Sequence, residues 1–187
     1  MRPRPLFSIV IPVFNEEGNI KLLISSLENA LTEYNYELIF VDDFSSDESC
    51  KIINSEANPH TSLIAFELHK GQSSALASGI KRARGHYIVT MDGDLQNDPS
   101  DIPKMLDIIQ NEALDMVIGF RQNRQDPFLK TMPSKIANFI IRMTTQLQIR
   151  DSGCALKVMT SKIAKELPLY GELHRFMALN AHLRGAR

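Results

Sequence analysis

Short apolar runs rich in β-branched residues recur along the first two thirds of the chain. Each run is continuous in apolar character rather than alternating, which is typical of strands buried on both faces of a parallel sheet. The runs are Phe7–Phe14, Glu37–Asp43, Ser62–Leu68, His86–Met91 and Asp115–Phe120. They predict five strands, and Cys154–Met159 is a candidate for a last one.

Between the runs, apolar residues recur at spacings of three and four, which indicates helices with one buried face. The helical segments are Glu17–Tyr34, Ser73–Arg84 and Asp101–Asn111. We expect Asp47 to cap a shorter helix that continues through Asn54, and Ser100 to cap the helix after Pro99. The alternation of strands and helices favours a doubly wound α/β sheet.

The pattern changes after Phe120. The segment Gln122–Pro133 is polar and basic and contains two prolines, which predicts a loop. Ser134–Leu147 is amphipathic with basic flanks, so it fits a helix packed on the sheet or one lying on a membrane surface. No stretch approaches the roughly 18 apolar residues that a membrane span needs. The basic N-terminus also lacks the apolar region of a secretory signal.

The formal net charge of -1 conceals an asymmetry between the two ends of the chain. Residues 1–119 carry 9 basic and 18 acidic side chains, whereas residues 120–187 carry 12 and 4. An acidic part can hold a cation, and a basic part can hold phosphates or contact an anionic surface. The counts alone are equally compatible with an ordinary solvated surface. The two cysteines lack metal-type spacing and fit reduced thiols.

Acidic and amide residues cluster after three of the predicted strands. The clusters are Asn15-Glu16-Glu17, Asp42-Asp43-Phe44-Ser45-Ser46-Asp47 and Asp92-Gly93-Asp94-Leu95-Gln96-Asn97-Asp98. Ligands of open α/β sheets bind at the carboxyl ends of strands, so we expect the clusters to meet in one cleft. Asp92 and Asp94 supply the oxygen ligands that Mg2+ or Mn2+ prefers, and Gly93 allows close approach of the backbone to a ligand.

Several other kinds of site are disfavoured. The chain has no phosphate-binding P-loop, no dinucleotide-binding glycine pattern after the first strand and no nucleophile elbow. Its five histidines do not pair at metal spacing, which favours ordinary surface or structural roles for most of them. The basic part lacks interleaved aromatic residues or a recognition motif, so a nucleic-acid partner is not expected.

Six motifs, in order across nearly the whole chain, make it resemble glycosyltransferase family 2, and within it the polyprenyl-phosphate (dolichol-phosphate-like) glycosyltransferases. They are Ile11-Pro-Val-Phe-Asn-Glu-Glu-Gly-Asn19, Val41-Asp-Asp-Phe-Ser-Ser-Asp47, Gly71-Gln-Ser-Ser-Ala-Leu-Ala-Ser-Gly79, Met91-Asp-Gly-Asp-Leu-Gln-Asn-Asp-Pro99, Gly119-Phe-Arg121 with Arg124, and Asp151-Ser-Gly-Cys-Ala-Leu156. The resemblance implies a GT-A fold, which is a Rossmann-like, mostly parallel sheet with helices on both faces. It also implies a nucleotide-sugar donor and Mg2+ or Mn2+ as cofactor.

The resemblance also implies roles by position. The base and ribose of the nucleotide would contact Pro12, Phe14, Asn15, Glu16, Val41 and Asp43. Asp92, Asp94 and Gln96 would hold the metal and diphosphate beside Gly93. The residues expected to act in catalysis are Asp94, Gln96 and Arg121. Arg121, Arg124 and Arg175 would hold phosphates of donor or acceptor, because a guanidinium fork binds phosphate oxygens in pairs.

Two features bear on the acceptor. The chain has no tryptophan, whereas the processive polysaccharide synthases of the family carry a Gln-x-x-Arg-Trp motif. Hydroxyl acceptors in the family often need a carboxylate base from a Glu-Asp pair, and here only Glu172 lies in that region, without the aspartate. A phosphate acceptor is largely ionised at pH 7 and needs no such base. We therefore expect a polyprenyl phosphate acceptor.

These expectations describe a single catalytic domain over residues 1–187 at the cytoplasmic face of a membrane, in peripheral contact with it. Many relatives add C-terminal membrane helices, so the chain is expected to be truncated relative to them. The chain is also expected to be able to form a homo-oligomer. Two alternatives stay open: a soluble family member that acts on a sugar or protein hydroxyl, and a nucleotide-sugar-binding module without turnover.

Overall fold

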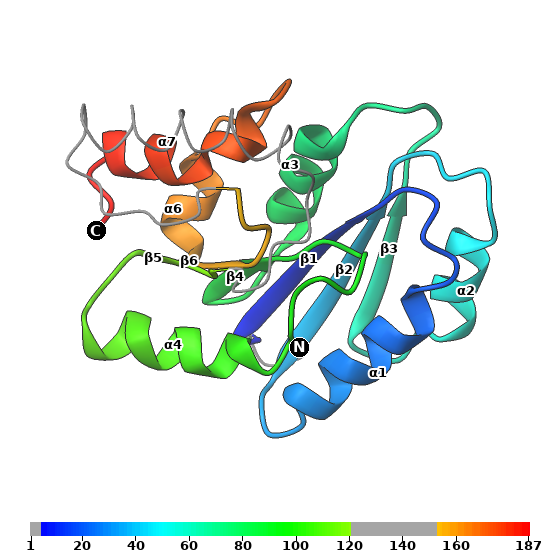
Figure 1. Ribbon diagram of the computed structural model, residues 1–187, viewed down its shortest axis with the longest axis horizontal. Coiled ribbons are helices and arrows are strands. Elements are labelled where there is room, and N and C mark those ends of the chain that lie inside the picture. The colour runs from blue at the N-terminus through cyan, green and yellow to red at the C-terminus, as the bar shows by residue number, and fades with distance from the viewer. Residues whose placement is uncertain (1–4, 121–152) are drawn as a thin grey trace, which may run out of the picture.

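The computed structural model describes residues 5–120 and 153–187. A six-stranded sheet in the order β3-β2-β1-β4-β6-β5 forms its centre (Figure 1). The strands are β1 (Phe7–Val13), β2 (Tyr36–Asp42), β3 (Thr61–Ala65), β4 (Tyr87–Thr90), β5 (Met116–Ile118) and β6 (Lys157–Thr160). The predicted loop at Gln122–Pro133 and the amphipathic segment Ser134–Leu147 lie outside the described residues.

The first four strands are parallel, as the continuous apolar runs predicted. β1 pairs with β2 and β4, and β2 pairs with β3, all in parallel register. β6 is antiparallel to both β4 and β5 and lies between them. The sequence predicted β6 as a candidate strand, but a short apolar run carries no information on where in a sheet it will pair.

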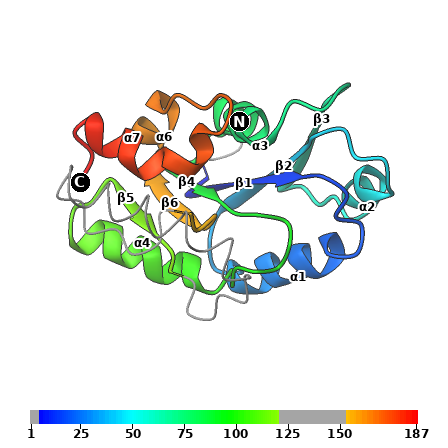
Figure 2. The same ribbon diagram turned by 45° about the horizontal axis from the view of Figure 1, so that its top comes forward.

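Helices cover both faces of the sheet (Figures 1 and 2). The helices are α1 (Ile20–Ala30), α2 (Ser49–Ser55), α3 (Gln72–Arg82), α4 (Asp101–Asn111), α6 (Ser161–Glu166), the 3₁₀ helix η1 (Leu173–Phe176) and α7 (Met177–Leu183). α1, α2 and α4 pack on one face, while α3, α6 and α7 pack on the other. The expected α/β fold with a mostly parallel, doubly wound sheet is therefore confirmed.

The two faces of β1 show why its sequence is apolar throughout. Phe7, Ile9 and Ile11 belong to the core under α1 and α4, whereas Val10 belongs to the core under α3. All four side chains are fully buried. No helix among the described residues is both long and apolar enough to cross a bilayer.

Both predicted helix caps need correction. α2 begins one residue later than expected, with Glu48 at its cap position, although Asp47 still accepts a hydrogen bond from the Ser49 backbone N–H at 3.0 Å. Ser100 does occupy the cap position of α4, but its side chain makes no capping hydrogen bond. Instead, Asp98 accepts a hydrogen bond from the Ser100 backbone N–H at 2.8 Å, because the aspartate two residues earlier reaches the same turn.

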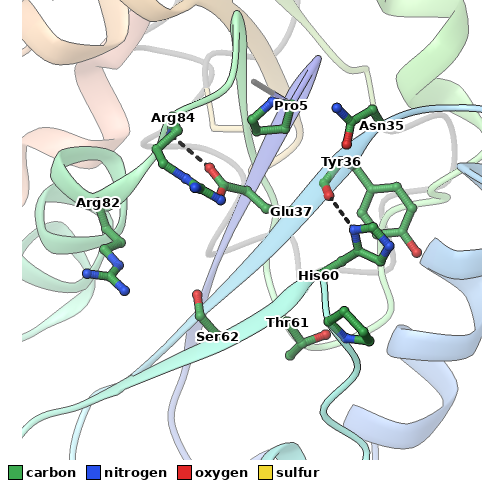
Figure 3. Close-up of a pocket in the computed structure, with 10 residues that line it drawn as sticks. Pro5, Asn35, Tyr36, Glu37, His60, Thr61, Ser62, Arg82 and Arg84 are labelled. Atoms are coloured by element: carbon green, nitrogen blue, oxygen red, sulfur yellow. Dashed lines mark hydrogen bonds and ion pairs between the residues drawn. The ribbon is translucent and has the colours of Figure 1, made fainter. Parts of the chain in front are cut away.

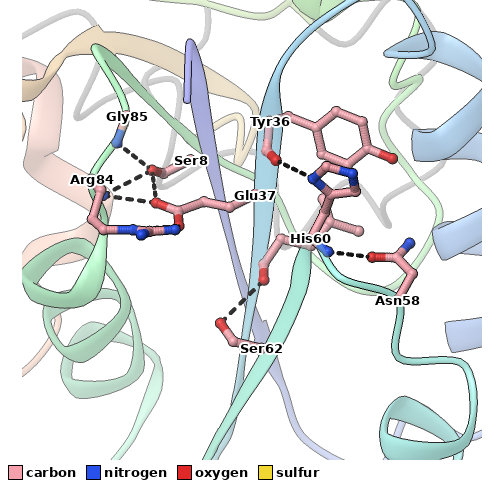
Figure 4. A network of polar contacts seen from close by, with 9 residues as sticks. Ser8, Tyr36, Glu37, Asn58, His60, Ser62, Arg84 and Gly85 are labelled. Atoms are coloured by element: carbon pink, nitrogen blue, oxygen red, sulfur yellow. Dashed lines mark hydrogen bonds and ion pairs between the residues drawn. The ribbon is translucent and has the colours of Figure 1, made fainter. Parts of the chain in front are cut away.

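A polar network joins the turn between α3 and β4 to the beginnings of β1 and β2 (Figure 4). The buried Ser8 hydroxyl donates to Glu37 at 2.6 Å and accepts from the Gly85 backbone N–H at 2.7 Å. Arg84 donates from Nε and Nη2 to the second Glu37 oxygen, at 3.1 and 2.8 Å. These contacts fix the crossover connection to the sheet at the edge where the strands begin.

The Glu37 carboxylate gives this network a pH dependence. Burial by itself raises the pKa of Glu37, but hydrogen bonds from Ser8 and Arg84 and the Arg84 charge lower it overall, below its usual 4.5. The ionised carboxylate therefore stabilises the fold above the unfolded pKa, and this contribution is lost as pH falls through the folded pKa. We expect wild type to unfold at higher denaturant concentration than Glu37→Gln at pH 7, with the difference shrinking below pH 4.5. A constant difference across that range would contradict this account.

Candidate functional site

A cavity of about 300 Å³ lies where the carboxyl ends of β1, β2 and β4 meet. Its lining comes from the loops after these strands and from the segment that leads into α3. The lining residues are Pro12, Val13, Phe14, Glu16, Asp43, His69, Gln72, Asp92, Gly93 and Asp94. The structure thus brings Asp43 and Asp94 to one cavity, as the expected convergence of strand ends requires.

The loops around the cavity hold unusual backbone conformations. Asn15, Phe44 and Leu95 follow β1, β2 and β4, and their φ angles are 56°, 69° and 61°. Among residues 5–120 and 153–187, only one other non-glycine residue has a positive φ. Such conformations cost free energy and persist where surrounding contacts enforce them, often at functional sites.

Asn15 supplies one of these enforcing contacts. Its side-chain oxygen accepts a hydrogen bond from the Ser46 backbone N–H at 2.8 Å, and its own backbone N–H donates to the Ser45 hydroxyl at 2.9 Å. The loops after β1 and β2 are thereby joined. Asn15 was expected to contact a nucleotide, but here its side chain connects two loops and does not line the cavity.

Asp43 connects the cavity wall to α3. Its carboxylate accepts hydrogen bonds from the backbone N–H groups of Lys70 and Gly71, at 2.7 and 2.8 Å. Gly71 has a φ of 85°, in the region that favours glycine, and it is the residue from which α3 begins. Asp43 therefore fixes the start of the helix while one side of the residue lines the cavity.

The Asp92-Gly93-Asp94 turn forms the wall after β4. Gln72 at the first position of α3 donates a hydrogen bond to Asp92 at 2.7 Å, and the Gln96 backbone N–H donates to Asp94 at 3.1 Å. A Cβ atom at Gly93 would meet its nearest neighbour at 3.6 Å, an ordinary contact. Packing within the chain therefore does not demand glycine here, and the space beside Gly93 belongs to the cavity.

The chemistry of this turn fits a hard divalent cation. Within the described ranges, no group of three or more His, Cys, Asp or Glu side chains could hold a metal by itself. Mg2+ typically takes only one or two protein carboxylates and completes its shell with water and phosphate oxygens. Asp92 and Asp94 match that donor set, on a half-exposed turn that lines the cavity.

Several expected site residues lie elsewhere. Val41 is fully buried between β2 and α3, because its side chain faces the core on that side of the sheet. Gln96 is exposed and not part of the lining. Arg175 lies on η1, where it is exposed and 3.0 Å from Glu172. Arg121 and Arg124 lie outside the described residues.

The structure adds two residues that sequence reasoning missed. His69 and Gln72 line the cavity from the segment between β3 and α3. The His69 ring lies 4.9 Å from the half-exposed Phe14 ring, and its Nδ1 is 3.0 Å from the Asp43 carboxylate. Their position in the sequence could have revealed them. Both residues lie beside Gly71 after the third predicted strand, and the acidic and amide clusters follow the other strands at the same place.

A larger cavity, about 660 Å³, lies at the opposite edge, where β2 and β3 begin (Figure 3). Its charged residues include Arg84 and Glu37, which bind each other in the network described above. Arg82 belongs to the last turn of α3, where a cation favourably meets the negative end of the helix dipole. These side chains have structural explanations, so the carboxyl edge is the candidate functional site.

Solved structures of low sequence identity share this fold. Glucosyl-3-phosphoglycerate synthase from Mycobacterium tuberculosis superposes with a TM-score of 0.77 over 96% of this chain and 66% of that protein, at 18% identity. A mannosyltransferase from Pyrobaculum calidifontis, solved in complex with GDP-Man and Mn2+, gives 0.72 over 99% of this chain and 54% of its own, at 17% identity. Both support the expected GT-A architecture.

Curated relatives are closer in sequence. The dodecaprenyl-phosphate galacturonate synthase of Rhizobium johnstonii is 41% identical over 178 residues, which cover 91% of this chain and 52% of that protein. The undecaprenyl-phosphate 4-deoxy-4-formamido-L-arabinose transferase of Yersinia enterocolitica is 35% identical over 180 residues, covering 94% of this chain and 55% of its own. The chain thus spans about half the length of these relatives. The model of glycosyl transferase family 2 matches residues 8–167. Together with the fold and these relatives, that match establishes that the chain belongs to glycosyl transferase family 2.

Proposed function

We propose that the chain transfers a sugar from a nucleotide-sugar donor to the phosphate of a polyprenyl phosphate, with inversion at the anomeric carbon. The observation that carries the proposal is the shared cavity of Asp92, Asp94, Phe14 and Asp43 at the carboxyl edge of the sheet. The names of the two curated relatives favour a polyprenyl phosphate acceptor. UDP- and GDP-linked sugars are the candidate donors.

The lining residues divide the work of binding the donor. The exposed face of Phe14, backed by the His69 ring, offers a flat surface for the nucleotide base. Asp92 and Asp94 would hold a divalent cation, Mg2+ or Mn2+, which supplies positive charge to the leaving diphosphate when bound. Gly93 leaves room for the diphosphate beside the backbone.

The proposed reaction is a single displacement. An acceptor phosphate oxygen donates its electron pair to the anomeric carbon while the bond from that carbon to the diphosphate oxygen breaks. The electron pair of the broken bond stays on the nucleoside diphosphate. Because a phosphate monoester is largely ionised at pH 7, no side chain has to remove a proton. Arg121, Arg124 and Arg175 are proposed to hold the phosphates.

A transfer assay tests the proposal. The chain is incubated with undecaprenyl phosphate in detergent and with UDP-galacturonic acid, UDP-glucose or GDP-mannose, with Mn2+ or with a chelator. We expect mass spectrometry to detect a glycosylated lipid phosphate with at least one donor, and only when the metal is present. Transfer to free sugars or peptides with an inert lipid phosphate would overturn the proposed acceptor.

The hydroxyl-acceptor alternative makes a different prediction for Glu172, which is exposed and paired with Arg175. With a phosphate acceptor, Glu172→Gln removes no catalytic base, so we expect kcat within about threefold of wild type. This range reflects the small contribution of an exposed ion pair. Lys104→Gln, which removes one partner of another exposed pair, is the matched control. Loss of turnover by a hundredfold or more in Glu172→Gln alone would favour a hydroxyl acceptor and a general base.

A further inference from the structure

The first turn of α3 contacts two parts of the molecule through neighbouring residues. Gln72 donates its hydrogen bond to Asp92 in the candidate site. The next residue, Ser73, is only 1% exposed, and it binds η1, which follows about a hundred residues later in the chain. The Ser73 Oγ lies 2.9 Å from His174 Nδ1 and 3.2 Å from the His174 backbone nitrogen.

These two contacts allow Ser73 and His174 to form a reciprocal pair of hydrogen bonds. The His174 backbone N–H can only donate, so Ser73 Oγ accepts that hydrogen bond. The Ser73 hydroxyl is then free to donate its own proton to Nδ1, which requires an unprotonated Nδ1 and places the imidazole proton on Nε2. The pair makes two reciprocal hydrogen bonds when His174 is neutral and carries its proton on Nε2.

The surroundings of His174 favour this neutral form. Burial is the largest effect and lowers the pKa of His174 below its usual 6.5. Arg175 on the same segment and Lys157 on β6 lower it further, while Glu172 opposes them. Ser73 is the facing polar group from α3. As pH falls below 6.5, protonation therefore costs free energy in the docked segment, and the docking weakens toward the folded pKa.

We propose that His174 is a positioning residue that fastens the segment carrying Arg175 to the start of α3, and so sets it relative to Asp92 through Ser73 and Gln72. This inference rests on the proposed function only in taking Arg175 as a ligand of the acceptor phosphate. His174 itself acts through the contact with Ser73. The contact joins η1, which carries the exposed Arg175, to the first turn of α3, where Gln72 binds Asp92.

Three variants test the positioning role. His174→Phe keeps a planar ring but removes the acceptor, Ser73→Ala removes the donor, and His174→Asn keeps an oxygen acceptor that does not titrate. We expect His174→Phe and Ser73→Ala to raise the acceptor KM about tenfold, the equivalent of one lost hydrogen bond, with donor KM unchanged. His174→Asn should stay near wild type at pH 7.5. As pH falls below 6.5, its acceptor KM should rise less than that of wild type, because the acceptor phosphate titrates with both proteins but residue 174 titrates only in wild type.

Two results would overturn the inference. One is an acceptor KM unchanged in His174→Phe. The other is an acceptor KM raised equally in His174→Asn and His174→Phe, which would indicate a role other than accepting from Ser73.

Amide hydrogen exchange separates this inference from the proposed function, because it requires no substrate. At pH 7.5, the amides of residues 173–176 should exchange faster in His174→Phe than in wild type, with His174→Asn close to wild type. This exchange pattern would support the contact between His174 and Ser73 even if no variant transferred a sugar to undecaprenyl phosphate. Absence of transfer would then count against the proposed function and leave the positioning role of His174 standing. Equal exchange in all three proteins would overturn the fastening.

Discussion

Replacing Asp94 with asparagine is expected to reduce turnover by about a thousandfold while leaving the fold intact. Asp94 lines the cavity, and the hydrogen bond it accepts comes from the Gln96 backbone N–H two residues away. Asparagine can still accept that hydrogen bond, so the turn should keep its shape. The lost negative charge removes one of two carboxylates proposed to hold the cation that stabilises the leaving diphosphate. Removing a single group that stabilises transition-state charge typically costs about 10²–10³ in rate.

The measurement is kcat in the lipid-phosphate transfer assay at saturating donor and metal. Asp107→Asn is the matched control, because Asp107 is an exposed aspartate on α4 that is absent from the cavity lining. Thermal melts of both variants should agree with wild type within about 2 °C, as for surface substitutions. Wild-type turnover in Asp94→Asn would remove Asp94 from the mechanism, and with it the metal site as proposed.

Gly85→Ala is expected to destabilise the fold strongly. A Cβ at Gly85 would lie 2.6 Å from the Ser8 backbone nitrogen and 2.8 Å from the Phe7 carbonyl carbon. Both are backbone atoms of the central strand, which cannot move aside like the end of a flexible side chain. The turn would have to shift and would strain the hydrogen bond from the Gly85 N–H to the buried Ser8 hydroxyl. We expect a loss of about 2–3 kcal/mol in the free energy of unfolding, typical of severe overpacking.

Urea unfolding at pH 7 measures this loss, and the melting temperature should fall by about 5–10 °C. Gly18→Ala is the matched control, because a Cβ there meets no atom within 4 Å and its φ is not positive. Stability within about 0.5 kcal/mol of wild type for Gly85→Ala would show that the turn adapts without cost.

The local pattern of apolar residues predicted the bounds of helices and strands better than it predicted which strands pair in the sheet. The runs at Phe7–Phe14 and Glu37–Asp43 became β1 and β2 within a residue, since strands buried on both faces need continuous apolar sequence. The helix Asp101–Asn111 has the predicted bounds. Pairing of β6 between β4 and β5 depends on contacts distant in sequence, so local periodicity could not reveal it.

The same distinction applies to the candidate site. Strand ends can be read from sequence, so the meeting of Asp43, Asp92 and Asp94 at one edge was predictable. Which way each side chain turns depends on packing. Val41 faces the core, and Asn15 turns toward the loop after β2, although both lie in the motifs that pointed to the nucleotide. Gln72 reaches the cavity because α3 begins beside it, which only the folded chain shows.

The interior position of β6 has a consequence for synthesis on the ribosome. Among the described strands, β5 pairs only with β6, and β4 pairs with β6 on the side that does not face β1. Both β4 and β5 leave the ribosomal exit tunnel before β6 does. Until β6 emerges, the position between β4 and β5 in the sheet therefore stays unfilled. Unpaired strand edges invite pairing with other chains, so a chaperone that binds the nascent chain during this interval would reduce aggregation.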